Sequence, residues 1–305
     1  MGSWYQKIRV THLDVPEERA KFRAFAGTVE EVVHSKTDDT ILAWKGKNVI
    51  GITANSNMAV GEIIDNHAIS RIVVLPENSK IATQYIVNNT LRLCRTIICE
   101  NMHLRTVENE AVVIIAGSMG SAVPYLQWLL IKGIRIILYL PPTENGDDEK
   151  YVEEHDYKHG LFNHPQFKPV SANGALNTVG ETLHAVIIRR KPVGVISEDV
   201  LTLTNGMGAS AVTVLPDAIK EFKAAEVHVS RQTLLAAGIG CRIVWHQALE
   251  QVDPCEAKCL FDKSGSLEFF NFDATLESHG ADGLVQHALL ETVKRATHNT
   301  IYVER

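Results

Sequence analysis

The sequence predicts an α/β protein assembled from repeated modules, each made of a β-hairpin, a helix and a further strand. Apolar runs that end in Leu-Pro recur at Leu75-Pro76, Leu140-Pro141 and Leu215-Pro216. Short glycine-containing turns between apolar runs recur along the chain and are typical of hairpins. The 305 residues accommodate five such modules of roughly 60 residues each, a period typical of stacked or radially arranged units.

The N-terminal third is predicted from period-two alternation, helical spacing of apolar residues and turn residues. Pro16 followed by Glu17 and Glu18 is typical of a first helical turn, because acidic side chains stabilise the positive end of a helix. Lys45-Gly46-Lys47 is typical of a tight turn. The expected elements are a strand at 7–12, a helix at 16–33, a hairpin of 40–44 and 48–52, a strand at 71–75, a helix at 81–93 and a strand at 96–99.

Residues 111–140 contain the clearest supersecondary unit. Its first apolar run is uninterrupted, as in a strand that is buried on both faces. Pro124 stands in the first turn of the following helix, where its missing N–H is tolerated, and Gly133 is a typical helix stop. The expected elements are a strand at 111–116, a turn at 117–120, a helix at 122–131 and a strand at 134–140.

The second half begins with a polar, acidic segment at about 142–180, which is expected to be a long surface excursion. After it the alternation of apolar runs and turns resumes. The expected elements are a hairpin of 185–188 and 193–196, a strand at 212–215, a helix at 231–237, a strand at 242–245, two strands at 259–262 and 267–272 around a turn at 263–265, a helix at 284–296 and a strand at 300–303.

Composition and charge exclude several classes of protein. The net charge of −6 supplies no general basic surplus of the kind that a nucleic-acid-binding surface requires, and the basic run at 189–191 is expected to be a solvated turn. Five irregularly spaced cysteines indicate a reducing compartment rather than a disulfide framework. The apolar runs are too short to span a bilayer, and no apolar signal segment is visible. A soluble intracellular protein of one compact domain is expected.

Three stretches carry a resemblance to a known family. Asn48-Val-Ile-Gly-Ile-Thr lies in the segment 40–57, Met102-His103-Leu104-Arg105 follows the strand expected at 96–99, and residues 249–254 lead into Cys255 to Cys259. In this order they resemble dimethylarginine dimethylaminohydrolase, a member of the pentein superfamily. The resemblance implies a single pentein-like domain over residues 1–305: a five-bladed β/α-propeller whose central channel is a natural small-molecule site.

The same resemblance implies a chemistry. It makes Cys259 a candidate nucleophile and His103 a candidate general acid and base, so that a thiolate attacks a guanidinium carbon while the imidazole transfers protons. Lys258, adjacent to Cys259, could favour the thiolate. Two parts of the family's pattern are missing: its substrate-binding arginine falls near Ala54 or Asn55, and its early acidic motif has no counterpart. The structural alternative is that Cys259 is a small buried residue of a strand.

These departures favour a catalytically degenerate relative. In size and in its departures the sequence resembles the pentein-like subunit that trypanosome mitochondria use in the complex that holds guide RNA and messenger RNA for uridine insertion and deletion editing. This implies a mitochondrial, non-catalytic scaffold that contacts other protein subunits, reaches RNA only indirectly and leaves oligomerisation open. No cofactor, metal or membrane partner is expected. The alternative is a cysteine-dependent hydrolase of a guanidino compound.

A glycine turn supports a third hypothesis. Gly117-Ser-Met-Gly120 lies between a strand and a helix, and the N-terminus of a helix can bind phosphate. The full dinucleotide fingerprint, with its third glycine and a distal acid, is absent. The third hypothesis is therefore a doubly wound nucleotide-binding protein, which a parallel open sheet without fivefold pseudosymmetry would support.

Candidate metal ligands are sparse. Cys255 and Cys259, with His246 upstream, lack the close pairing of a structural zinc site. Three histidines at 155, 159 and 164 form a loose cluster in the acidic segment and are expected to be solvated. The sequence therefore predicts no metal site.

Overall fold

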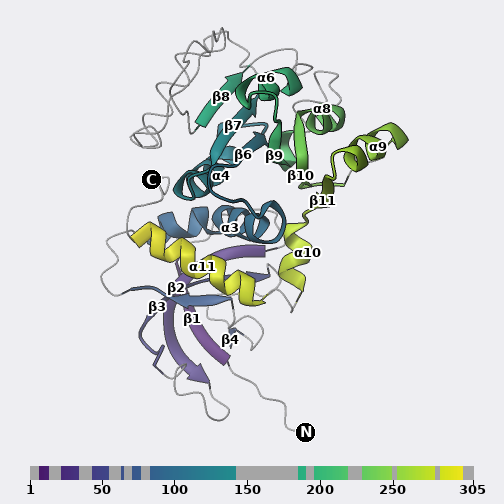
Figure 1. The fold of residues 1–305 in the computed structure, drawn as a ribbon. Helices are drawn as coiled ribbons and strands as arrows, with labels where there is room; N and C mark the ends of the chain where they lie inside the picture. Colours follow the sequence, from purple (N-terminus) through teal and green to yellow (C-terminus); the bar gives the residue numbers. More distant parts are fainter. Residues whose placement is uncertain are drawn as a thin grey trace. The chain divides into compact units, whose positions relative to one another are not determined.

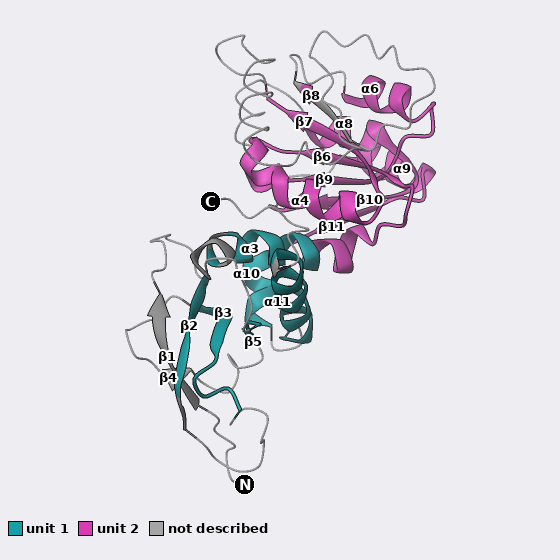
Figure 2. Ribbon diagram, turned by 90° about the vertical axis from the view of Figure 1, so that its left-hand side faces the viewer, with its two compact units in different colours: residues 1–98, 272–305 teal, residues 99–271 magenta. Residues whose placement is uncertain are grey.

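The structure, a computed structural model, divides the chain into two compact units (Figure 2). Unit 1 comprises residues 1–98 and 272–305, and unit 2 comprises residues 99–271. The chain thus begins unit 1, completes unit 2 and returns to unit 1. The residues that the structure describes are 7–13, 22–33, 43–54, 63–64, 71–76, 83–141, 185–189, 196–218, 229–248, 253–278 and 282–297. Within these ranges, no helix has the length and apolar character needed to cross a membrane.

Unit 1 is built on a five-stranded sheet in the order β4-β1-β2-β3-β5, in which each pair of neighbours is antiparallel. The long strand β2 lies in the middle and pairs with β1 and β3, which are labelled beside it in Figure 1. The elements are β1 (Lys7–Leu13), β2 (Phe22–Val33), β3 (Asn48–Ala54), β4 (Ile63–Ile64), β5 (Ile72–Val74), α3 (Thr83–Cys99), α10 (Phe272–Glu277) and α11 (Asp282–Thr297).

The returning segment is attached to the sheet of unit 1 by a long-range ion pair. Arg71 precedes β5 and donates from Nε to Oδ1 of Asp282, the first residue of α11, at 3.1 Å. Its guanidinium also lies over the ring of Phe22, 5.9 Å from the centroid. The ion pair joins residues that are 211 positions apart in the chain, so α11 is fixed to the edge of the sheet.

Unit 2 is built on a six-stranded parallel sheet in the order β11-β10-β9-β6-β7-β8. From β6 in the middle the chain winds outward through β7 to β8, then returns to β9 on the other side and continues to β11. This is the doubly wound arrangement, with its switch point between β6 and β9. The elements are η2 (Glu100–Leu104), β6 (Ala111–Ile115), α4 (Met119–Ile131), β7 (Arg135–Leu140), β8 (Ala185–Arg189), α6 (Ile196–Leu203), β9 (Ala209–Val214), α8 (Val229–Ala236), β10 (Ala237–Trp245), α9 (Pro254–Asp262) and β11 (Ser266–Phe269).

The core of unit 2 explains the unbroken apolar run of the central strand. Every residue of β6 is buried, as expected for a parallel strand covered on both faces. Because side chains alternate between the faces of a sheet, Val113 and Ile115 share one face, where they pack in a cluster with Ile196 of α6 and Leu234 of α8. Helix α4 packs against β6 and β7.

This arrangement corrects the predicted five-bladed pentein-type β/α-propeller. The strands form one open parallel sheet and a separate antiparallel sheet, not radial blades. The recurring Leu-Pro pairs do mark the ends of β5, β7 and β9. Proline ends a strand in either architecture, however, because it cannot donate the next hydrogen bond of the ladder. The parallel open sheet of the third hypothesis is confirmed.

Most individual elements are confirmed, although several pairings differ. The confirmed elements are those expected at 7–12, 48–52, 71–75, 81–93, 111–116, 122–131, 134–140, 212–215, 231–237, 242–245 and 284–296. The expected hairpin arm at 43–44 is instead part of a turn, and β3 pairs with β2 and β5. The strand at 185–189 pairs in parallel with β7. Of the second arm expected at 193–196, residues 193–195 lie outside the described residues and Ile196 begins α6. The surface excursion at 142–180 and the strand at 300–303 lie outside the described residues.

Three predictions of local structure are wrong. Residues 22–33, expected to be helical, form β2, because ladders to strands on both sides outweigh a weak helical preference. Residues 96–99 complete α3 instead of forming a strand, and residues 259–262 end α9. In each case a short apolar run fits helix and strand equally well, and the tertiary neighbours decide between them.

Gly51 of β3 should be sensitive to substitution. A Cβ there would lie 2.7 Å from the ring of Phe25 and 2.9 Å from the carbonyl oxygen of Arg71, whereas a Cβ at Gly283 meets nothing within 4 Å. We expect Gly51→Ala to lower the free energy of unfolding by about 1–3 kcal/mol through overpacking. Gly283→Ala, the matched control in α11, should be neutral or stabilising. Urea unfolding followed by circular dichroism measures both, and equal effects would contradict the prediction.

Candidate functional site

The described part of the chain brings two loops together at the switch point of unit 2. Strands β6 and β9 are parallel neighbours, and the amide of Leu215 still donates to the carbonyl of Ile115 at 2.9 Å where the strands end. Gly117 lies in the turn that follows β6, and Asp217 lies in the helical residues 216–218 that follow β9. In doubly wound sheets, ligands bind in the crevice outside the carboxyl ends of the strands at this point.

The turn after β6 depends on the absence of a side chain at Gly117. A Cβ at this position would lie 2.6 Å from the carbonyl oxygen of Asp217 and 2.7 Å from its carbonyl carbon. The two backbones therefore touch. Gly120 is different, because it is exposed and a Cβ there would meet nothing within 4 Å. The turn thus combines one closely packed glycine with one that leaves the backbone open.

Helix α4 starts inside this turn. Ser118 is its N-cap, with an extended backbone and a side-chain oxygen that accepts from the amide of Ser121 at 3.3 Å. The first turn contains no acidic side chain. Since the first amides of a helix have no partner within the helix and carry partial positive charge, this end of α4 can hold an oxygen of an anionic group.

The turn matches the dinucleotide fingerprint in part. The fingerprint requires glycine, then glycine two residues later, then glycine or alanine three residues after that. Gly117 and the fully buried Ala122 satisfy the first and last positions, and Met119 stands at the second. Glu144 is the first acidic residue after β7 in the sequence and lies outside the described residues. The sequence analysis considered a glycine at the last position of the fingerprint, but not the alanine that this position also permits.

A second polar cluster surrounds His246, which follows β10. Its Nε2 lies 3.1 Å from the hydroxyl of Tyr125 on α4, 3.1 Å from the hydroxyl of Thr213 on β9 and 3.6 Å from Sγ of Cys99. The ring of Phe270 meets the imidazole edge-on at 5.2 Å. The histidine therefore bridges elements that are distant in sequence. No zinc pairing with Cys255 or Cys259 is formed, and within the described ranges no three metal-ligating side chains cluster.

The predicted catalytic histidine belongs to a structural contact. Nδ1 of His103 lies 2.7 Å from Oε2 of Glu268 on β11, and Arg105 donates to Oε1 of the same carboxylate at 2.9 Å. The imidazole also lies against the ring of Phe270 at 5.2 Å. These contacts fasten η2 to the edge of the sheet.

The predicted nucleophile lies on a helix. Cys259 is partly buried on α9 and packs at the edge of the cluster formed by the sheet, α6 and α8. Lys258 pairs with Asp262 at 3.2 Å. Neither Cys259 nor Lys258 is among the contacts of His103 described above, and catalytic roles for Cys259 and His103 rested on the pentein resemblance alone.

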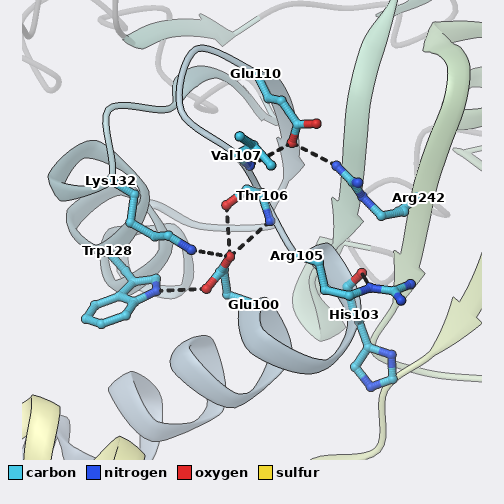
Figure 3. A network of polar contacts seen from close by, with 9 residues as sticks. All are labelled: Glu100, His103, Arg105, Thr106, Val107, Glu110, Trp128, Lys132 and Arg242. Carbon is cyan, nitrogen blue, oxygen red and sulfur yellow. Dashed lines mark hydrogen bonds and ion pairs between the residues drawn. The ribbon is translucent and has the colours of Figure 1, made fainter.

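Glu100 is a buried charge that sequence reasoning missed (Figure 3). Its side chain is 1% exposed and accepts through Oε1 from Nζ of Lys132 at 2.5 Å, and from the amide and hydroxyl of Thr106 at 3.0 and 2.9 Å. Trp128 donates to Oε2 at 3.4 Å. Lys132 and Trp128 come from the end of α4, so the network fixes the helix whose other end lies at the switch point. A lone glutamate gives no periodic signal by which it could be found in the sequence.

Comparison with known proteins finds similarity at the level of structure. No protein-family model and no curated protein matches the sequence. A structure described as an NADPH:quinone reductase from Bacillus thuringiensis matches with a TM-score of 0.61 and 14% identity, over 99% of this chain and 81% of that one. A 2-haloacrylate reductase gives 0.62 and 12%, over 99% and 82%. The quinone oxidoreductase of Escherichia coli in complex with NADPH gives 0.57 and 13%, over 99% and 82%.

The fold is that of these reductases. Their similarity covers both units and overturns the resemblance to pentein proteins and dimethylarginine dimethylaminohydrolase. The non-catalytic scaffold of an RNA-editing complex and the guanidino hydrolase, which depended on that resemblance, are corrected with it. The mitochondrial location and the protein partners stay predictions.

We expect Glu100→Gln to destabilise unit 2. The glutamine side chain has the same size but cannot form the ion pair with Lys132. Its NH2 group would also face groups that donate hydrogen bonds to the carboxylate of Glu100. Removing one partner of a buried pair costs about 3–5 kcal/mol, so an effect near 3 kcal/mol is expected because Lys132 is partly exposed. Glu198→Gln, at an exposed position of α6, is the control. Urea unfolding that shows a loss below about 1 kcal/mol would contradict this role.

Cysteine reactivity should follow burial. Burial raises the pKa of the thiols of Cys94 and Cys241 to about 12, whereas Cys255 is exposed. At pH 8, alkylation mapped by mass spectrometry should label Cys255 in the native protein and reach Cys94 and Cys241 only after unfolding. Because the raised pKa keeps protons on the folded state, stability should be full below pH 9 and fall as the pH approaches 12. Rapid native labelling of Cys94 or Cys241 would contradict this prediction.

Proposed function

We propose that the protein is an oxidoreductase that binds a nicotinamide dinucleotide at the switch point of unit 2 and reduces an electron-poor substrate such as a quinone or an activated alkene. The observation that carries this proposal is the glycine turn at the switch point of a doubly wound parallel sheet. The names of the structural neighbours, a quinone reductase and a haloacrylate reductase, support the reaction class. Their sequence identity to this chain is too low to establish the reaction class by itself.

The residues of the crevice fit the diphosphate of such a cofactor. Gly117 lets the turn pass against the loop after β9, and Gly120 leaves open space beside the first turn of α4. The amides of this turn can donate to phosphate oxygens, and the helix N-terminus favours their charge. The buried apolar end of β6 keeps the turn rigid, so the donors are positioned before a ligand arrives.

The chain's own side chains have limited roles in this scheme. A bound reduced nicotinamide supplies a hydride. Ser118 caps α4 and so orients the amides at its N-terminus. Glu100 and Lys132 hold the opposite end of the same helix, and His246 bridges α4 and β9 from beside the sheet. These contacts position the turn without touching the cofactor.

Gly120→Asp is the sharpest test of this site. The substitution has room for its side chain but places a carboxylate where the diphosphate would bind, so we expect affinity for NADPH or NADH to fall at least about tenfold. Gly283→Asp adds the same side chain at an open position of α11 in unit 1 and should leave affinity unchanged. Isothermal titration calorimetry measures binding, and absorbance at 340 nm measures oxidation of either nucleotide by quinones and enones. A folded protein that binds neither nucleotide would refute the proposal.

A further inference from the structure

The helical turn that follows β9 places a carboxylate beside the proposed diphosphate site. Oδ2 of Asp217 accepts a hydrogen bond from the hydroxyl of Ser118 at 2.9 Å. Ser118 is the N-cap of α4, and its oxygen also accepts from the amide of Ser121. The hydroxyl of Ser118 therefore lies between the carboxylate of Asp217 and the amide of Ser121 at the start of α4.

Asp217 is held in this place by the backbone and not only by its hydrogen bond. Its carbonyl oxygen lies 2.6 Å and its Cγ 3.0 Å from the position of a Cβ on Gly117. The amide of the next residue, Ala218, donates to the carbonyl of Leu215 at 3.1 Å, within the helical residues 216–218 that follow β9. The backbone of Asp217 therefore packs against the turn at Gly117, and the hydrogen bond from Ser118 orients its carboxylate.

Among the described residues, the side-chain partner of the Asp217 carboxylate is the hydroxyl of Ser118 at the N-terminus of α4. Oδ1 is buried and has no hydrogen-bond partner among the described residues. The positive end of α4 favours an anion, and Asp217 already supplies one. An arriving diphosphate would have to share this favourable end with a carboxylate of the same sign.

We propose that Asp217 is a built-in competitor of anionic ligands at the switch point and determines which ligands bind there by their charge. This inference rests on the proposed function, because it assigns a residue that weakens the binding of the dinucleotide. Asp217 acts on the phosphate groups and not on the rings, since its contacts are with Ser118 and with the turn at Gly117. Ligands without phosphate are unaffected by it.

Replacing the charge while keeping the shape tests the inference. We expect Asp217→Asn to bind NADH and ADP-ribose about tenfold more tightly than the unaltered protein, and to bind adenosine with unchanged affinity. Asp217→Ser replaces the carboxylate with a neutral hydroxyl and should behave in the same way. Asp262→Asn, at the exposed end of α9, removes one negative charge elsewhere and should change none of the affinities. Calorimetry gives the dissociation constants, and circular dichroism confirms that each variant is folded.

The possible results separate the two proposals. If the unaltered protein binds NADH and the Asp217 variants bind it equally or more weakly, this inference is overturned and the proposed function stands. If the variants also gain affinity for adenosine, the effect is not one of charge and the inference fails. If the folded unaltered protein binds no nicotinamide nucleotide, the proposed function falls, and the inference falls with it unless the Asp217 variants bind ADP-ribose.

Discussion

The contact between Gly117 and Asp217 is the constraint on which the candidate site depends. Two parallel strands, β6 and β9, end side by side, and their following loops meet so closely that a single added carbon at Gly117 would overlap the backbone of Asp217. The approach is possible because β6 and β9 are neighbours only in the doubly wound order. From this contact follow the direction in which α4 starts, the open backbone at Gly120 and the presence of a carboxylate beside the helix N-terminus. The packing therefore leaves backbone open to an anionic ligand at this point, whereas the carboxylate of Asp217 repels such a ligand.

Around the apolar sheet of unit 2, polar side chains form hydrogen bonds and ion pairs that hold segments outside the hydrophobic core in place. Glu100 holds the end of α4, and Glu268 joins His103 and Arg105 to β11. Lys263 donates to the carbonyls of Leu234 and Ala237 at 2.7 and 2.6 Å, which satisfies the end of α8. Each contact joins a segment before or after a strand to a distant element. Such contacts restrict the geometry of the loops, whereas the apolar cluster supplies most of the stabilisation.

The incorrect architecture predicted from the sequence has an identifiable physical origin. A blade of a propeller and a strand–helix–strand unit of an open sheet contain the same local parts: a short apolar run, a proline or glycine stop and an amphipathic helix. The distinction lies in whether neighbouring strands pair in parallel or antiparallel fashion, and a short apolar run does not specify the hydrogen-bond direction. The contact of His103 with Glu268 on β11 likewise depends on the tertiary structure, and the motif around His103 does not reveal it.

By itself the sequence determined the α/β class, most strands and helices, and the unit of β6, glycine turn, α4 and β7, because these depend on residues close together in the chain. It also made Gly117 and Gly120 recognisable as a turn before a helix. Only the tertiary structure decided the strand order, the division into two units, the strand at 22–33 and the encounter of Gly117 with Asp217, which are 100 positions apart in the chain numbering. The physical reason is that pairing between distant strands depends on the whole set of available partners, and no local pattern of side chains encodes that choice.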